Sequence, residues 1–174
     1  VNALFLNTDL FQKYKVNVPP DDSVMTWDEF QELCRQLSES IKADNTHGID
    51  YVYLEQSGWR EFYAAVLQNG VSPFDRLENP QLCLMDTPEA IEASIYYFNL
   101  SLKYRYLPTI LEYISVLKSA PGTLFVQGKV PMYLCPTEEF YQLSPEMLKF
   151  GVKVIPRPRG KERIAFASVK NMAI

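Results

Sequence analysis

Apolar residues along the chain fall into two patterns, short continuous runs and positions with helical spacing. The runs predict strands at 1–6, 49–54, 130–134 and 152–155, with a possible last strand at 164–166. The helical spacing predicts helices at 9–14, from 27 to at least 41, at 58–68, from 88 up to Pro108, and over 109–127 with a break at Pro121-Gly122. Strands that alternate with helices define an α/β fold.

Two of the predicted helices carry clear start signals. Thr26 and Glu29 have the spacing of a capping box, and Thr87 precedes Pro88 at a first helical turn. Each of these two helices has an apolar stripe that we expect to be buried in the core. The stripes consist of Trp27, Phe30, Leu33, Cys34, Leu37 and Ile41 on the first helix, and of Ile91, Ile95, Phe98 and Leu102 on the second.

The composition is that of a folded globular domain. The 174 residues are enough for one domain with a buried core, and 47% hydrophobic against 22% charged residues argues against disorder. A formal net charge of -4 argues against nucleic acid as a partner, because phosphate binding needs concentrated Lys and Arg. One basic segment is either a solvated surface or a docking site for an anionic partner. It contains Lys149, Lys153, Arg157, Arg159, Lys161 and Arg163.

The cysteines and the single histidine do not point to metal or redox chemistry. Cys34, Cys83 and Cys135 lie far apart, which excludes a disulfide framework, and we expect Cys34 in the core. His47 lies in a polar turn and is expected to be solvated. No apolar stretch approaches the ~20 residues of a membrane span. The sequence starts at Val1 without a charged-then-apolar leader, so we expect any export signal to lie outside this chain.

No catalytic constellation emerges from the chain. Ser115 and Lys118 form a Ser-x-x-Lys pair, but the partner motifs of the acyl transferases that use this pair are absent. The carboxylates of Asp21-Asp22 and of Glu138-Glu139 are neighbours on one segment and cannot face each other across a glycoside. No glycine-rich phosphate loop or cluster of metal ligands occurs. We therefore expect a protein that is not an enzyme, with no cofactor and no metal.

Aromatic residues are abundant, with 11 Tyr, 10 Phe and 2 Trp, and aromatic rings are suited to binding the apolar faces of sugars. Phe30, Phe62 and Phe98 have helical spacing and are expected in the core. Trp59 and Tyr63 begin a helix directly after a predicted strand, at a sheet edge where ligands of α/β proteins gather. These two residues are candidate ligand contacts, with a core role as the alternative.

The loop after the strand at 130–134 is a second candidate for ligand contact. Glu138 could accept hydrogen bonds from solute hydroxyls, and Phe140 could stack on a ring. The alternative is that Thr137 caps a helix whose first turn carries Glu138 and Glu139. Both interpretations could hold together.

Several short segments, taken in order, resemble the sugar-type extracellular solute-binding proteins of bacterial ABC importers, and together they cover almost the whole chain. They are Ala3 to Phe11, Thr26 to Phe30, Gln68-Asn69-Gly70, Asp86 to Ala90, the set Phe125, Gly128, Lys129, Val130 and Met132, the pair Pro156 and Gly160, and Ala173-Ile174.

Three departures from the family pattern leave the ligand class open. Pro131 stands where the family prefers Ala, which predicts a strand that is distorted or lies at the sheet edge. Residues Pro136 to Phe140 replace the family's Gly-x-Trp, so the usual tryptophan platform is either missing or replaced by Phe140. Val71 replaces a second glycine after Asn69-Gly70.

The resemblance implies one lobe of a type II periplasmic-binding-protein-like fold, with a mixed sheet flanked by helices. Residues 1–174 would form the second, C-terminal-type lobe between two hinge crossings, with the first lobe outside this chain. Such a protein is extracytoplasmic, either periplasmic or lipid-anchored. It is expected to be a monomer that captures a carbohydrate-type solute between its lobes and delivers it to the membrane permease. A single lobe keeps only part of the contacts, so we expect millimolar or undetectable binding.

Two alternatives from other classes remain at this point. One is a glycan-processing enzyme domain, which needs an acid and a base that converge across a pocket. The other is a sensor or scaffold domain that reuses the lobe without transport. The identity of the solute is not encoded in any motif of the chain.

Overall fold

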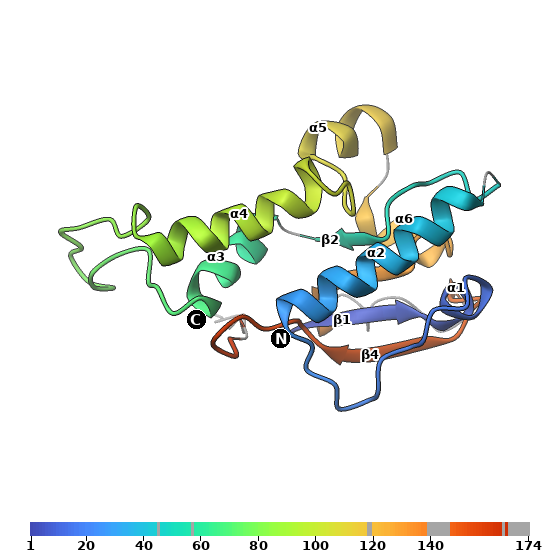
Figure 1. Ribbon diagram of the computed structural model, residues 1–174, viewed down its shortest axis with the longest axis horizontal. Helices are drawn as coiled ribbons and strands as arrows, with labels where there is room; N and C mark the ends of the chain where they lie inside the picture. Colours follow the sequence, from blue (N-terminus) through green and yellow to red (C-terminus); the bar gives the residue numbers. More distant parts are fainter. Residues whose placement is uncertain (45, 57, 118–119, 139–146, 165, 167–174) are drawn as a thin grey trace, which may run out of the picture.

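Four strands form one mixed sheet in this computed structural model, which describes residues 1–44, 46–56, 58–117, 120–138, 147–164 and 166 (Figure 1). The strands are β1 (Asn2–Asn7), β2 (Tyr53–Glu55), β3 (Met132–Pro136) and β4 (Val152–Pro156), in the order β2-β3-β1-β4. Strand β1 is antiparallel to both β3 and β4, and β2 is parallel to β3. The mixed sheet flanked by helices confirms the predicted α/β class.

The sheet has two apolar faces because side chains alternate along each strand. Leu4 and Leu6 of β1 belong to a core cluster that also contains the apolar stripe of helix α2 (Trp27–Ala43). Ala3 and Phe5 point the other way, into a cluster with helix α6 (Pro121–Val126). The all-buried pattern of β1 therefore follows from helices on both sides of the sheet.

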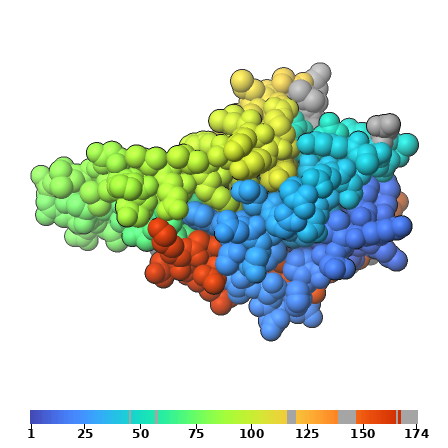
Figure 2. Space-filling view, viewed as in Figure 1, coloured from blue at the N-terminus to red at the C-terminus, as the bar shows by residue number. Residues whose placement is uncertain are grey.

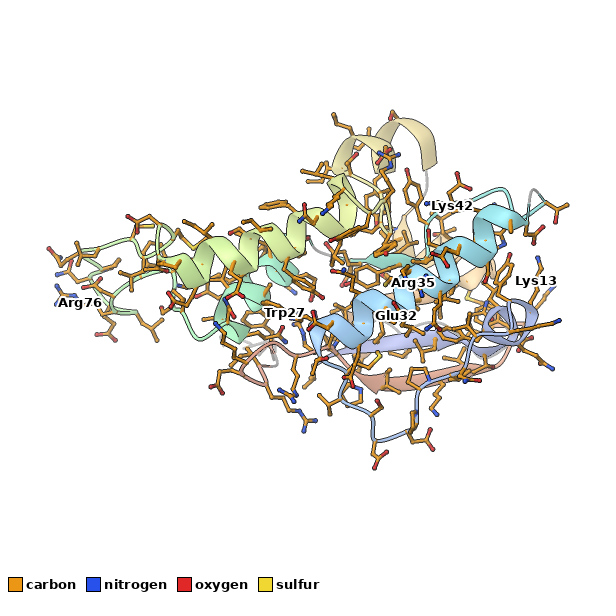
Figure 3. The ribbon with its side chains drawn as sticks, in the orientation of Figure 1. Lys13, Trp27, Glu32, Arg35, Lys42 and Arg76 are labelled. Atoms are coloured by element: carbon orange, nitrogen blue, oxygen red, sulfur yellow. The ribbon has the colours of Figure 1, made fainter. Side chains whose placement is uncertain are left out.

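Helix α2 begins where the sequence predicted. The Thr26 main-chain N–H donates to Glu29 Oε2 over 2.7 Å, and the Glu29 N–H donates to Thr26 Oγ1 over 3.3 Å, which completes the capping box. Its predicted stripe is buried, including Cys34, except that Trp27 is half-buried. Figure 3 shows Glu32, Arg35 and Lys42 along the same helix, on the side away from the core.

The remaining helical elements are α1 (Thr8–Lys13), α3 (Gly58–Gln68), α4 (Pro88–Leu102), α5 (Ile110–Glu112) and the π-helical turn η1 (Tyr113–Leu117). Helices α3 and α4 pack beside each other through Val66, Ala90 and Ala93, and the loop between them extends beyond the sheet (Figures 1 and 2). None of the described helices is long and apolar enough to cross a bilayer.

The predicted buried stripe of α4 is wrong. Ile91, Ile95, Phe98 and Leu102 are between 47% and 68% exposed, whereas Ala90, Ala93 and Leu100 are buried. Small alanines allow α4 to approach α3 closely, and most side chains of α4 are apolar, so the helix offers more than one apolar face. The prediction that Phe98 lies in the core is therefore also wrong, while Phe30 is buried and Phe62 half-buried.

Two predicted strand features differ from the structure. Strand β2 is only three residues long, and the N–H groups of Val52 and Tyr53 both donate to Tyr106 O. Strand β3 begins directly after Pro131, so the missing proline N–H costs no ladder bond, and β3 is a central strand rather than an edge strand. Ile164 and Phe166 are not in a strand, and residue 165 lies outside the described residues.

Two side chains for which the sequence analysis considered a solvated position are partly or fully buried. His47 is half-buried because its Nδ1 pairs with the Tyr14 hydroxyl over 2.7 Å and its Nε2 with Lys129 O over 2.9 Å. Arg157 is only 9% exposed and pairs with Glu61, so the basic segment is not a uniformly solvated surface.

Candidate functional site

One edge of the sheet gathers the ends of three strands. Because β2 and β3 are parallel, their carboxyl ends lie together, with Glu55 opposite Leu134. The antiparallel strand β1 starts at the same edge, where Asn2 lies opposite Pro136. Helix α3 begins at Gly58, shortly after β2 ends. Side chains from the start of α3 therefore lie beside the last residue of β2.

Glu55 at this edge is a buried acid, with 5% of its surface exposed. The Tyr53 hydroxyl donates to its Oε2 over 3.1 Å, and the Tyr97 hydroxyl from α4 forms a short hydrogen bond with its Oε1. The Tyr97 hydroxyl also lies 2.8 Å from the main-chain oxygen of Gly58. The Tyr97 hydroxyl has one proton, which the Glu55 carboxyl and the Gly58 carbonyl share as acceptors.

Burial is the main cause that raises the pKa of Glu55, which reaches about 7. The nearby carboxylate of Glu61 raises that pKa further, whereas the Tyr97 and Tyr53 hydroxyls and the charge of Arg157 lower it. A carboxyl group that titrates near neutrality in a concave site is a candidate functional group.

An open cavity of about 1280 Å³ lies against Glu55. Its wall is formed by the start of α3, the outward face of α4, and α5 with the turn that follows. Aromatic and aliphatic side chains dominate the wall, including Trp59, Phe62, Phe98, Leu102, Ile110 and Ile114. Trp59 is 69% exposed, so its indole is available to a ligand. An apolar cavity with a few polar groups is the usual form of a small-molecule site.

Of the two residues predicted at the start of α3, only Trp59 lines this cavity. Tyr63 is half-buried, and its ring stacks on Phe166 with the centroids 5.7 Å apart. Residues four apart lie on the same side of a helix, so it is the contact with Phe166 that separates Tyr63 from Trp59 in its surroundings.

Of the second predicted pair, from the loop after β3, Glu138 does not line the cavity. Glu138 is exposed, with its Oε2 3.9 Å from the amino nitrogen of Val1, and it is at the same edge of the sheet as Glu55. Phe140 lies outside the described residues. Sequence reasoning missed Glu55 and Tyr97. The available signal was an acid directly after an apolar strand, in front of the predicted helix at 58–68.

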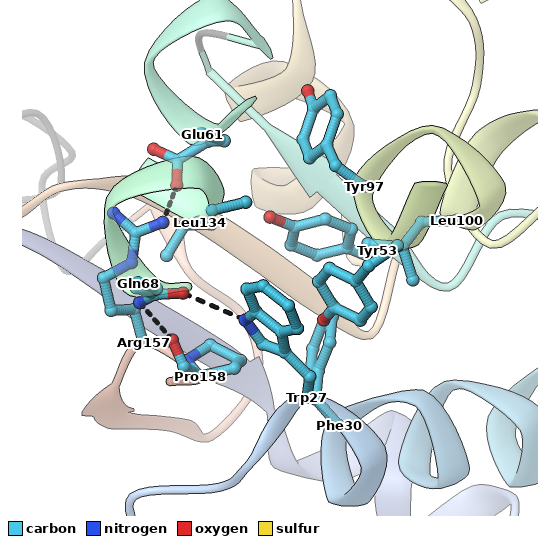
Figure 4. Close-up of a pocket in the computed structure, with 12 residues that line it drawn as sticks. Trp27, Phe30, Tyr53, Glu61, Gln68, Tyr97, Leu100, Leu134, Arg157 and Pro158 are labelled. Carbon is cyan, nitrogen blue, oxygen red and sulfur yellow. Dashed lines mark hydrogen bonds and ion pairs between the residues drawn. The ribbon is translucent and has the colours of Figure 1, made fainter. Parts of the chain in front are cut away.

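Glu61 is a second buried acid, and the positive charge of Arg157 balances its carboxylate (Figure 4). Its Oε2 accepts from Arg157 Nη2 over 2.5 Å, and its Oε1 accepts from Asn2 Nδ2 over 2.6 Å. Burial raises the pKa of Glu61, and the charge of Arg157 opposes that rise. The pair connects α3 to the end of β4.

Gln68 lines a small cavity of about 40 Å³ together with Glu61 and Arg157 (Figure 4). It accepts from Trp27 Nε1 over 3.0 Å and donates to Pro158 O over 2.8 Å. These bonds hold α2, α3 and the segment after β4 in one arrangement. The network therefore has a structural role at the edge that carries Glu55.

The chain is similar to several solved structures. No family model and no curated protein sequence matches it. The ABC substrate-binding protein Lmo0181 from Listeria monocytogenes, in complex with cycloalternan, superposes with a TM-score of 0.72 at 21% identity over 93% of this chain. Maltose-bound MalE3 of T. maritima gives 0.63 at 20% over 92%, and M. tuberculosis UspC gives 0.68 at 20% over 94%.

This chain covers only 38%, 39% and 43% of the lengths of those three structures. At such identities the match establishes the fold. The chain thus has the fold of a part of these solute-binding proteins, as the resemblance of its short segments predicted.

Proposed function

We propose that this chain is one lobe of a carbohydrate-type solute-binding protein that delivers its solute to the permease of an ABC importer. In this proposal residues 1–174 form the second lobe, between two hinge crossings, and the solute binds in the cleft between the lobes. The protein acts outside the cytoplasmic membrane as a monomer and performs no chemistry on the solute. The observation that carries the proposal is the superposition of nearly the whole chain on Lmo0181.

The names of the matched structures support a sugar as the solute. Lmo0181 was solved with cycloalternan, and MalE3 with maltose. The open cavity adds independent support, because an exposed indole beside hydrogen-bonding groups suits a ring with one apolar face and a rim of hydroxyls. Trp59 would stack on the sugar, and the groups around Glu55 would bind hydroxyls.

The proposal also includes the other three predicted residues, and the support for a ligand contact differs from one to the next. Glu138 lies at the same sheet edge and is exposed, so it could accept hydroxyls from a solute that extends past Trp59. Phe140 follows it in the sequence as the proposed wall of the site. Tyr63 would have to leave Phe166 to contact the same solute.

A glycan-processing enzyme is the second candidate, because a carboxyl group with a pKa of about 7 is suited to general acid catalysis. Such an enzyme also needs a second carboxylate that is free to act. The nearby buried carboxylate of Glu61 is held by both Arg157 and Asn2. Binding without turnover is therefore the better supported function.

Ligand-observed NMR with maltose and maltotriose tests the proposal on this chain. We expect millimolar binding, about 4 kcal/mol, that is lost in Trp59→Ala. Phe74→Ala is the matched control, because Phe74 is also an exposed aromatic residue (44%) but lies outside the cavity wall. Equal loss in both variants, or hydrolysis of maltotriose that depends on Glu55, would overturn the proposal. Micromolar binding by this lobe alone would contradict the weak binding that we expect.

A further inference from the structure

Glu55 differs from Glu61, the other buried acid that the structure describes, in having no ion-pair partner among the described residues. Glu61 forms an ion pair with Arg157, whereas no Lys, Arg or His nitrogen pairs with Glu55 among the residues that the structure describes. Within the described part of the chain, the hydrogen bonds of its two oxygens come from the hydroxyls of Tyr53 and Tyr97. Buried carboxylates are normally paired, because an unpaired charge in an apolar interior is costly.

A positively charged group of a ligand can reach Glu55 from the open cavity. Glu55 lines the open cavity, and the aromatic rings of Trp59, Phe62, Tyr97 and Phe98 line the same cavity. Ring faces attract cations when the charge lies within about 6 Å of the ring centroid. Trp59 already has this contact, because the guanidinium carbon of Arg60 lies 5.4 Å from the centroid of its ring. A carboxylate surrounded by aromatic rings is a suitable receptor for an ammonium group.

We propose that the solute carries an ammonium group, as an amino sugar does, and that this group binds beside Glu55 among the aromatic side chains of the cavity. The inference rests on the proposed function, since it specifies the class of solute for the same site. The sugar ring would stack on Trp59 while its ammonium group supplies the counter-ion that Glu55 lacks.

The neighbours of Glu55 determine how this binding depends on pH. They come from every element around it: Tyr53 of β2, Glu61 of α3, Tyr97 of α4, Tyr113 of η1, and Arg157 after β4. The pKa of Glu55 is about 7, and an ammonium group favours its ionised form. A ligand with a fixed positive charge should therefore bind more tightly as the pH rises through 7.

Matched ligands test the charge requirement by ligand-observed NMR on the 174-residue chain. At pH 7 we expect D-glucosamine to bind about fivefold more tightly than D-glucose, and Glu55→Gln to remove this preference. Glu78→Gln is the control, because it replaces an exposed carboxylate outside the cavity wall and should keep the preference. Equal affinities in the wild-type chain, or a preference that survives in Glu55→Gln, would overturn the inference.

A second measurement needs no variant and applies even if Glu55→Gln fails to fold. Choline keeps its charge at every pH, so only the protein titrates; we expect several-fold tighter binding at pH 8 than at pH 6. Binding of choline that does not change with pH contradicts the inference. If glucose and maltose bind as well as glucosamine, the proposed function stands and this inference fails. If neither glucosamine nor choline binds, this inference fails.

Discussion

The indole ring of Trp27 stacks on the phenol ring of Tyr96, with the ring centroids 4.1 Å apart and the planes inclined by 6°. This contact joins the first residue of α2 to the middle of α4. Tyr97, the next residue, turns its hydroxyl toward Glu55. Two adjacent tyrosines thus fix the rotation of α4 about its axis, and this rotation leaves the more apolar stripe of Ile91, Ile95, Phe98 and Leu102 exposed.

The stacked pair should contribute measurably to stability. Trp27→Ala removes both the ring contact and the hydrogen bond to Gln68, so we expect a loss of about 3 kcal/mol in the free energy of unfolding. Trp27→Phe keeps an aromatic ring but loses the hydrogen bond to Gln68. It should lower the free energy of unfolding by about 1 kcal/mol less than Trp27→Ala does. Urea unfolding measures both values. Equal stability of Trp27→Ala and the wild type would show that the contact does not position α4.

The exposed stripe of α4 should tolerate polar residues. Because Ile95 is 57% exposed, we expect Ile95→Gln to change the free energy of unfolding by less than about 0.5 kcal/mol and to reduce binding of an apolar dye such as ANS. Leu37→Ala is the comparison: Leu37 is fully buried, and its truncation should cost about 3 kcal/mol. A comparable cost in Ile95→Gln would mean that the stripe belongs to the core, as the sequence pattern predicted.

Glu55 should make the stability of the chain depend on pH. Its pKa rises from 4.5 to about 7 on folding, so the folded state holds a proton that the unfolded state releases between these values. The free energy of unfolding of the wild type, measured relative to that of Glu55→Gln, is therefore highest below pH 4.5. This difference falls by about 3 kcal/mol as the pH rises through 7.

Urea unfolding at pH 4.5, 6 and 8 checks this dependence. Glu138→Gln serves as the control, because an exposed carboxylate should leave the stability difference from the wild type nearly constant. A constant difference between the wild type and Glu55→Gln would show that Glu55 ionises on its own without penalty in the folded state.

The ion pair of Arg157 and Glu61 should behave as a buried pair. Arg157→Met leaves the Glu61 carboxylate without its cation, so we expect a loss of about 4 kcal/mol. The double variant with Glu61→Met should lose less, because no unpaired charge then remains. Lys161→Ala is the control, since its ion pair with Glu92 is exposed and should contribute less than about 1 kcal/mol. Additive losses in the double variant would contradict a coupled pair.

Much of the fold was predictable because its signals are local. The capping box of Thr26 and Glu29 and the cap at Thr87 depend on residues within one turn, so short segments located these two helix starts correctly. The apolar run of β1 likewise predicted a buried strand. Of the four predicted site residues, Trp59 lines the cavity because it follows β2 at the start of α3, a relation already visible in the order of elements.

Local pattern alone therefore specified most of the elements, the starts of α2 and α4, and the α/β class. Which face of α4 is buried, and the burial of Glu55 against the Tyr97 hydroxyl, were decided by contacts between segments far apart in the sequence. Trp27 is paired with Tyr96, and Glu55 with Tyr97. An apolar helix has several faces of similar hydrophobicity, so only its neighbours in three dimensions select one. The pKa of a carboxyl group likewise depends on what surrounds it after folding, and its sequence neighbours do not encode that environment.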